Sequence, residues 1–213
     1  MSAAPPRLVL ATHNRHKVVE LRAILGPVMP WLDPALVVGA VDLHAPEPVE
    51  DGVTFAENAL IKARALVAST GLPAVADDSG LCVDVLGGAP GIFSARWAGR
   101  HGDDAANLTL LLVQLEDVVP EHRGAHFACA AAFVTPDGFE HVETGALRGR
   151  LAAAPRGQGG FGYDPVLVPE QQPARAAGRL LTCAELTAEE KNAISHRGEA
   201  FRSLAPVVAA RLA

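Results

Sequence analysis

The sequence predicts an α/β fold for this chain of 213 residues. Two short apolar segments, residues 7–11 and 36–41, have the length and composition of buried strands and alternate with stretches of helical periodicity. Hydrophobic residues make up 49% of the chain, which is enough for one domain with a sizeable core. In a third stretch, residues 73–99 (PAVADDSGLCVDVLGGAPGIFSARWAG), an apolar run meets two adjacent carboxylates at an expected strand end, where α/β sheets gather ligands.

The composition argues against several classes of partner and cellular location. The formal net charge is -6, whereas binding to a nucleic acid polymer needs a basic surface, so no such partner is expected. No apolar run approaches the roughly 18 residues of a membrane-spanning helix, and MSAAPPRL lacks the pattern of a signal peptide. We therefore expect a cytoplasmic protein without membrane association. Three widely spaced cysteines suit reduced thiols better than disulfides or a zinc site.

Lysine is rare in this chain. Of the 18 basic residues only three are lysines, namely Lys17, Lys62 and Lys191. In an arginine-rich protein, a retained lysine can indicate a compact ammonium that meets a phosphate oxygen. Chance placement is the alternative, although each lysine falls in a segment that resembles a motif.

The first strand leads into a loop, residues 12–17 (THNRHK), and then into a helix. A strand, a loop and a helix N-terminus in this order point free backbone N–H groups at an anion, and Lys17 would lie in the first turn. An ordinary capped helix is the alternative, because the glycine patterns of P-loops and dinucleotide folds are missing. His13 and His16 without a third ligand would make a poor zinc site.

A second helix begins after a proline-rich acidic connector, with a Thr-x-x-Glu capping box at Thr54. Asn58 and Lys62 are four residues apart, so they share a face of this helix that could look into a cleft. Glu50 and Asp51 lie just before the helix. They are candidate hard-oxygen metal ligands, with exposed loop carboxylates as the alternative.

The central stretch predicts that a buried strand ends at residues 73–76 and leaves the core through DDSG, residues 77–80. Neighbouring side chains of an extended chain point to opposite faces. Only one of Asp77 and Asp78 can therefore face a given cleft, while the other anchors the turn.

The following segments predict structure rather than chemistry. Asp103 is expected to cap a helix that runs to about residue 116, and Arg96 is expected to be structural or interfacial. Residues 125–134 and 139–147 flank Pro-Asp-Gly and predict a β-hairpin.

Residues 157–165 (GQGGFGYDP) form a glycine-rich loop in which Phe161 and Tyr163 could stack on a base. Asp164 would hold the turn or accept a hydrogen bond. A glycine-rich hairpin with one aromatic ring in the core is an equally weighted alternative.

The last segment starts with a second capping box at Thr187, followed by Lys191. We expect a kink at Gly198 that leaves His196 and Arg197 exposed to a ligand, and then a final helix that carries its apolar face into the core. Together with the sparse lysines and acidic residues, these parts suit a magnesium nucleotide site, because a triphosphate needs local cations on a chain of this net charge.

Five motifs also resemble a known family in order and spacing. They are ATHNRHK, EDGVTFAENALIKARA, ADDSGLCVDVLGGAPGIFSARWAG, GGFGYDPV and AELTAEEKNAISHRG. They are similar to those of the inosine triphosphate pyrophosphatases, the Ham1-like enzymes that act on non-standard purine nucleotides. The resemblance spans residues 1–213 as a single two-lobed domain. It implies an elongated mixed sheet with a central active-site cleft, a homodimer, dependence on Mg2+, and hydrolysis of ITP, XTP and dITP to the monophosphate and pyrophosphate.

The same resemblance implies roles for individual residues. Phosphate contacts are implied for the loop and two lysines: Thr12, His13, Asn14, Arg15, His16, Lys17, Lys62 and Lys191. Metal binding is implied for Glu50 and Asp78, and Asp78 would also be the base that activates water. Contacts to the rest of the nucleotide are implied for Ser79, Phe161, Gly162, Tyr163, Asp164, Lys191, His196 and Arg197. Many members have glycine where His13 and His16 stand, and Asp51 remains an alternative to Glu50.

The expected reaction is attack of water on the α-phosphorus, with pyrophosphate as the leaving group. A purine with a 6-oxo group offers an acceptor where adenine offers a donor, so donors on His196 and Arg197 would favour the former. Two alternatives stay open. One is a Maf-type pyrophosphatase for other nucleotides, and the other is a nucleotide-binding protein without catalysis.

Overall fold

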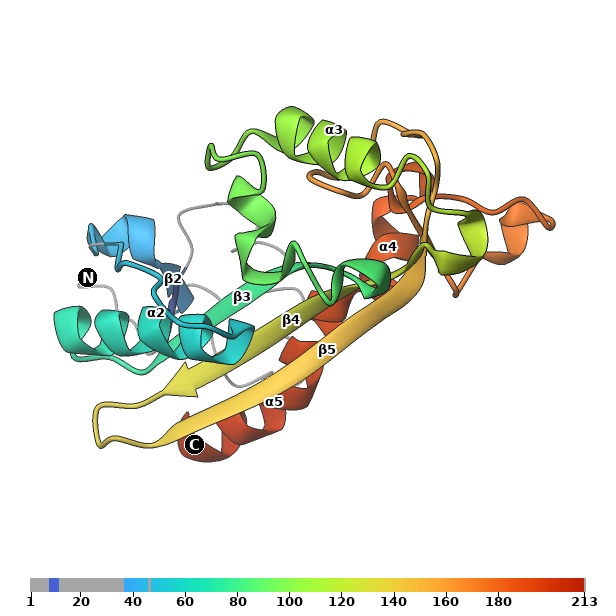
Figure 1. Cartoon of the computed structure of the whole chain (residues 1–213). Coiled ribbons are helices and arrows are strands. Elements are labelled where there is room, and N and C mark those ends of the chain that lie inside the picture. The colour runs from blue at the N-terminus through green and yellow to red at the C-terminus, as the bar shows by residue number, and fades with distance from the viewer. Residues whose placement is uncertain (1–7, 12–36, 46, 213) are drawn as a thin grey trace. The chain divides into compact units, whose positions relative to one another are not determined.

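The computed structural model describes residues 8–11, 37–45 and 47–212 (Figure 1). The predicted anion loop of residues 12–17 and the helix after it lie outside this part of the chain. The helices and strands are β1 (Leu8–Leu10), β2 (Val37–Gly39), α2 (Phe55–Thr70), β3 (Ala74–Val83), α3 (Asp104–Gln114), β4 (Gly124–Val134), β5 (Glu140–Leu151), β6 (Leu167–Pro169), α4 (Ala188–Ile194) and α5 (His196–Leu212). Among the helices described, none combines the length and apolar character needed to cross a bilayer.

The strands form one six-stranded mixed sheet in the order β2-β1-β3-β4-β5-β6, which confirms the predicted α/β class. β1 pairs in parallel with β2 and with β3, with Val9 opposite Val38 and Ala74. β5 and β6 are antiparallel. The segment predicted as a strand at residues 36–41 is shorter than expected, because the chain turns into a 3-10 helix at Ala40.

The chain divides into two compact units. The first comprises Met1–Asp78, Cys129–Gly145 and Arg197–Ala213, and the second comprises Ser79–Ala128 and Ala146–His196. β3, β4 and β5 each contribute residues to both units, and the division of β3 falls between Asp78 and Ser79.

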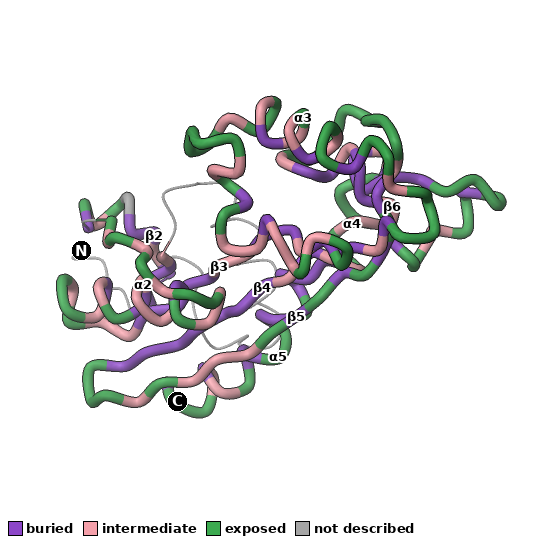
Figure 2. Tube along the Cα trace, viewed as in Figure 1, coloured by how far each residue is buried: buried purple, intermediate pink, exposed green. Residues whose placement is uncertain are grey.

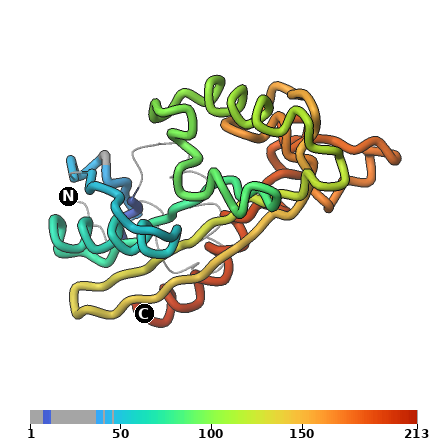
Figure 3. The backbone as a smooth tube through the Cα atoms, viewed as in Figure 1, coloured from blue at the N-terminus to red at the C-terminus, as the bar shows by residue number. Residues whose placement is uncertain are grey.

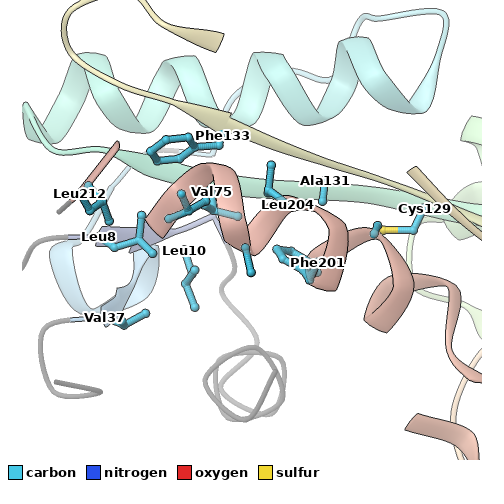
Figure 4. Packing of buried hydrophobic residues seen from close by; sticks show 13 residues of the cluster. Leu8, Leu10, Val37, Val75, Cys129, Ala131, Phe133, Phe201, Leu204 and Leu212 are labelled. Atoms are coloured by element: carbon cyan, nitrogen blue, oxygen red, sulfur yellow. The ribbon is translucent and has the colours of Figure 1, made fainter. Parts of the chain in front are cut away.

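In the core of the first unit, strand β4 is buried on both faces, and alternate residues along it pack in two different clusters. On β4, the residues Cys129, Ala131 and Phe133 pack in a cluster with Phe201, Leu204 and Val208 of α5 (Figure 4). The intervening β4 residues, Ala130, Ala132 and Val134, pack instead with Ala59 and Ala63 of α2. The two helices thus cover opposite faces of the strands, which explains why residues 127–134 of β4 form an uninterrupted apolar run. The predicted core face of the final helix is confirmed.

The second unit has its own core. Leu81 and Val83 of β3 pack with Leu111 and Leu115 of α3 and with apolar residues of β4, β5 and β6. Figure 2 shows residues 129–134 of β4 as an unbroken buried stretch, whereas the β5 residues from Thr144 to Leu151 alternate between exposed and buried. Asp103 caps α3 by accepting a hydrogen bond from the Ala106 amide at 3.1 Å, as predicted.

The β4–β5 hairpin follows its sequence signal closely (Figure 3). The Thr135 amide donates to the Phe139 carbonyl at 3.0 Å, and the Gly138 amide donates to the Thr135 carbonyl at 3.0 Å. Gly138 has φ of 87°, a left-handed conformation that glycine adopts without strain. The Pro-Asp-Gly prediction is therefore confirmed.

Two predicted boundaries are wrong. β3 does not end at Ala76 but continues through DDSG to Val83, so these residues are strand rather than turn. The expected kink at Gly198 is absent, because α5 runs through this glycine, and the break between α4 and α5 lies at Ser195. At DDSG, the ion pair between Asp77 and Arg197 holds a polar residue in regular structure.

Candidate active site

Asp77 and Asp78 project to opposite faces of β3. Val75 packs in the cluster with α5, whereas Ala76 packs in the cluster with α2. By the alternation of a strand, Asp77 belongs to the α5 face and Asp78 to the α2 face. Their partners agree, because Asp77 contacts Arg197 of α5 and Asp78 contacts Lys62 of α2. The prediction that the two aspartates diverge is confirmed, but Asp77 anchors a helix rather than a turn.

A cluster of two carboxylates and one ammonium surrounds Lys62. We call Glu50, Asn58, Lys62 and Asp78 the carboxylate–lysine cluster. Lys62 Nζ lies 2.9 Å from Asp78 Oδ1 and 3.3 Å from Glu50 Oε1. Asn58 Nδ2 donates to the other carboxylate oxygen, Asp78 Oδ2, at 3.3 Å. The helix face that the spacing of Asn58 and Lys62 predicts is thus the face that meets Asp78.

The cluster has a deficit of positive charge. Burial alone would lower the pKa of Lys62, but the carboxylates of Asp78, Glu50 and Asp77 raise it above the ordinary lysine value. Burial raises the pKa of Asp78 and the Glu50 carboxylate adds to this, so Lys62 and Asn58 offset the shift only in part. One ammonium shared by two carboxylates leaves a net charge near -1, which favours a further cation.

The donor set fits a magnesium ion. Glu50 and Asp78 supply hard oxygen atoms from two segments, and they already flank a cation, the Lys62 ammonium. No group of three or more His, Cys, Asp or Glu side chains within residues 8–11, 37–45 and 47–212 is arranged to hold a metal. Mg2+ commonly binds through only one or two carboxylates together with substrate phosphates and water, so two carboxylates are sufficient.

His196 and Arg197 are not in the exposed positions that the sequence predicts. Their exposed fractions are 9% and 4%, because they begin α5 instead of preceding a kink. Arg197 Nε donates to Asp77 Oδ2 at 2.9 Å, in an ion pair buried on both sides. The His196 ring stacks on Phe127 with centroids 5.1 Å apart. These contacts fix the orientation of both side chains.

The glycine-rich loop of the second unit is held by Asp164. Asp164 Oδ2 accepts hydrogen bonds from the Phe161 amide at 2.8 Å and from Lys191 Nζ at 2.5 Å. Gly160 has φ of 72°, and a side chain there would collide with the Asp164 carboxylate. The predicted role of Asp164 in holding the turn is confirmed, and Lys191 of α4 is brought to the same loop.

The two aromatic residues of this loop have different environments. Phe161 is 61% exposed, and Lys191 Nζ lies 5.0 Å from the centre of its ring. Tyr163 is only 5% exposed and donates its hydroxyl hydrogen to the Ser94 carbonyl at 3.0 Å. Burial, and secondarily the Asp104 carboxylate, raise the pKa of the Tyr163 hydroxyl. The prediction that both rings are available for stacking is therefore wrong for Tyr163, which matches the core alternative instead.

The comparisons with known proteins identify the family. The sequence profile of the Ham1 family matches residues 8–207. This chain belongs to the Ham1 family. A dITP/XTP pyrophosphatase of Streptomyces coelicolor is 66% identical over 202 residues, which cover 95% of this chain and 96% of the relative. A dITP/XTP pyrophosphatase of Leifsonia xyli is 54% identical over 204 residues, with 96% of each chain covered.

Solved structures of similar proteins share the fold of this Ham1 family member. A HAM1 protein from Coxiella burnetii is 38% identical with a TM-score of 0.81, and the match covers 95% of this chain and 98% of that one. A nucleoside-triphosphatase, or dITP/XTP pyrophosphatase, from Mycobacterium abscessus is 49% identical with a TM-score of 0.74 and the same coverage. The predicted family is therefore confirmed.

Three further residues, Asn58, Ser94 and Asp104, contact the candidate site or the strand and loop beside it. The sequence predicts a cleft-facing position for Asn58 but no role, although its side chain contacts Asp78. Ser94 and Asp104 carried no signal, yet Asp104 Oδ2 accepts from the Gly162 amide at 2.9 Å and Ser94 Oγ accepts from the Leu81 amide at 2.9 Å. Only the helical spacing of Asn58 could have pointed to its contact. The other two contacts depend on long-range packing.

Proposed function

We propose that this protein hydrolyses ITP, XTP and dITP to the nucleoside monophosphate and pyrophosphate. The observation that carries the proposal is the carboxylate–lysine cluster, which places two carboxylates beside a lysine in a member of the Ham1 family. Relatives that the chain matches over nearly their whole length are named dITP/XTP pyrophosphatases, which supports the same substrate class.

The chemistry expected at Asp78 is general base catalysis. Lys62 and Asn58 engage its two carboxylate oxygens, which fixes the orientation of the side chain that would take the proton of the attacking water. The water oxygen forms a bond to the α-phosphorus while its proton passes to Asp78. The bond from the α-phosphorus to the bridging oxygen breaks, and pyrophosphate leaves with the bonding electrons. A positioned base contributes about 10² to 10⁴-fold to such a rate.

We propose Mg2+ as the cofactor, with Glu50 and Asp78 as its protein ligands. When bound, it would neutralise charge on the phosphates during displacement. Lys62 is the proposed phosphate contact in the first unit, together with residues 12–17. Asp51 is a weaker ligand candidate, because Glu50 is the carboxylate that contacts Lys62.

A further set of residues is proposed to bind the nucleoside. The exposed ring of Phe161 would stack on the base, supported by Gly162, and Lys191 and Asp164 would contact the nucleotide beside it. Ser79 would contact the substrate next to Asp78. Tyr163 would act by holding the loop through Ser94 rather than by stacking. Donor groups on His196 and Arg197 would select the 6-oxo purine.

A substrate panel tests this proposal. Purified protein would be offered ITP, XTP, dITP, GTP, ATP, dUTP and dTTP with and without Mg2+, and pyrophosphate release would be measured. We expect turnover of the first three only, and only with Mg2+. Preference for dUTP or dTTP would instead support a Maf-type activity, and Mg2+-dependent stabilisation by nucleotide without turnover would indicate a binding protein. Sedimentation would test the homodimer that the resemblance predicts.

A further inference from the structure

Asn58 is a buried amide with two polar contacts in the carboxylate–lysine cluster. Its exposed fraction is 1%. Its Oδ1 accepts from the Gly52 amide at 2.9 Å, while its Nδ2 donates to Asp78 Oδ2 at 3.3 Å. Because both ends of the amide are used, neither a carboxylate nor an apolar side chain of similar size can make both contacts.

The contact to Gly52 fixes the segment that carries Glu50. Glu50 lies two residues before Gly52. A side chain at Gly52 would bring its Cβ to 2.6 Å from Asn58 Oδ1 and 2.8 Å from Glu57 Cβ, so this segment lies directly against the helix start. Glu57 Oε2 holds the next two residues by accepting from the Val53 amide at 2.7 Å and the Thr54 amide at 3.0 Å.

With the contact from Asn58, each carboxylate oxygen of Asp78 has its own hydrogen-bond donor. Lys62 engages Oδ1 and Asn58 engages Oδ2, from positions one helical turn apart on α2. We infer that Asn58 is a positioning residue, which sets the placement of the Glu50 segment relative to the Asp78 carboxylate. This inference rests on the proposed function, in which both carboxylates serve the metal and Asp78 is the base. Displacement of a reacting group by about 1 Å can cost 10²-fold in rate.

Two variants separate the two contacts. Asn58→Asp keeps an acceptor for the Gly52 amide but removes the donor to Asp78 and adds a negative charge. We expect kcat for ITP to fall about 10 to 100-fold with KM changed less than threefold. Gly52→Ala changes neither the Asn58 nor the Asp78 side chain chemically, but it forces the Glu50 segment and the Asn58 amide apart, since the new Cβ would lie 2.6 Å from Asn58 Oδ1. For this variant we expect at least a threefold rise in the Mg2+ concentration that gives half-maximal rate.

Asn107→Asp provides a matched control. Asn107 is also 1% exposed, and it also uses both ends of its amide, accepting from the Ala98 amide at 2.7 Å and donating to the Ala95 carbonyl at 3.1 Å. Its substitution should lower the melting temperature, as any buried Asn→Asp change can, while kcat and the Mg2+ requirement stay within twofold of wild type.

A second measurement does not depend on turnover. The rise in melting temperature with added Mg2+ or Mn2+, without nucleotide, reports metal affinity. We expect a weaker response in Gly52→Ala than in wild type and an unchanged response in Asn107→Asp. If Asn58→Asp does not fold, Gly52→Ala still decides the question.

The inference is overturned if both cluster variants keep the kcat and the metal response of wild type, or if Asn107→Asp alters them equally. If wild type hydrolyses no nucleotide, the proposed function fails. The metal response of the variants then still shows whether Asn58 positions the two carboxylates.

Discussion

The two lysines that the structure describes lie in ion-pair centres with different charge balance. Lys62 has two carboxylates within 3.3 Å, so its centre is short of positive charge. Lys191 pairs with one carboxylate, Asp164 at 2.5 Å, and its charge is balanced. The Lys191 centre also includes the exposed ring of Phe161, whereas the Lys62 centre lies among buried or half-buried polar groups. Under the proposed function, the Lys62 centre would hold a metal ion and the exposed Phe161 ring beside Lys191 would stack on the base.

The largest effect is expected when the Asp78 carboxylate is removed from the Lys62 centre. Asp78→Asn should lower kcat for ITP by at least about 10³-fold, because the base and a metal ligand are lost together. Pyrophosphate release measures the loss. Since burial raises the pKa of Asp78, its ionised form costs folding free energy at neutral pH, and a neutral amide removes that cost. The melting temperature should therefore equal or exceed that of wild type, and a variant that retains a tenth of the activity would exclude Asp78 as the base.

The next challenge removes each lysine in turn. Lys62→Met leaves two carboxylates without their shared ammonium, and we expect a loss of up to about 3 kcal/mol of unfolding free energy. This corresponds to a fall of about 6 to 12 °C in melting temperature. Mg2+ should restore much of it by replacing the missing charge. The melting temperature of Lys191→Met should fall less, because Asp164 keeps the Phe161 amide as a hydrogen-bond donor. Mg2+ should not selectively restore the melting temperature of this variant. Equal recovery of both variants in Mg2+ would contradict the difference in charge balance.

The third comparison concerns the aromatic residues of the glycine-rich loop. Phe161→Ala should raise KM for ITP about 5 to 100-fold, because stacking of a base on an aromatic ring contributes roughly 1 to 3 kcal/mol. The exposed ring contributes little to folding, so the melting temperature should hold. Tyr163→Phe should instead lose about 1 kcal/mol of stability with its hydrogen bond to Ser94. Steady-state kinetics and thermal melts distinguish the two outcomes, and a KM unchanged in Phe161→Ala would remove this ring from the site.

Local signals were sufficient for much of the fold. Both capping boxes, the Asp103 cap and the hairpin turn lie where the sequence predicts them, because each depends on residues within a few positions. The face shared by Asn58 and Lys62 was also predictable, since helical spacing fixes it. In contrast, the polar and glycine residues of DDSG predict a turn, because such residues are uncommon in strands.

Tertiary contacts explain why that interpretation was wrong. Asp77 stays in the strand because Arg197, 120 positions away, neutralises it. Gly80 is needed because a side chain there would collide with Ser94 and the Gly91 carbonyl, not because the chain turns. The same Asp77 contact explains the burial of Arg197, which the sequence placed at an exposed break. No local pattern contains such partners.

The smallest effects are expected when the N-terminal caps of α2 and α4, the helices that carry Lys62 and Lys191, are removed. Thr54 and Thr187 each begin a capping box, with Oγ1 accepting from the Glu57 amide at 3.1 Å and the Glu190 amide at 3.2 Å. Replacing either by Ala should cost about 1 kcal/mol. α2 has 16 residues and a buried face, so Thr54→Ala should lower the melting temperature by about 2 to 4 °C and leave kinetics unchanged.

α4 has only seven residues and none of them is fully buried, so it depends more on its cap. Thr187→Ala should therefore loosen α4 and displace Lys191 from Asp164 and Phe161, which raises KM for ITP by about 2 to 5-fold with little change in kcat. Parallel measurement of KM and melting temperature in both variants provides the test. A KM effect in Thr54→Ala and none in Thr187→Ala would reverse the assignment, because the Lys62 centre would then be the one whose helix needs its cap.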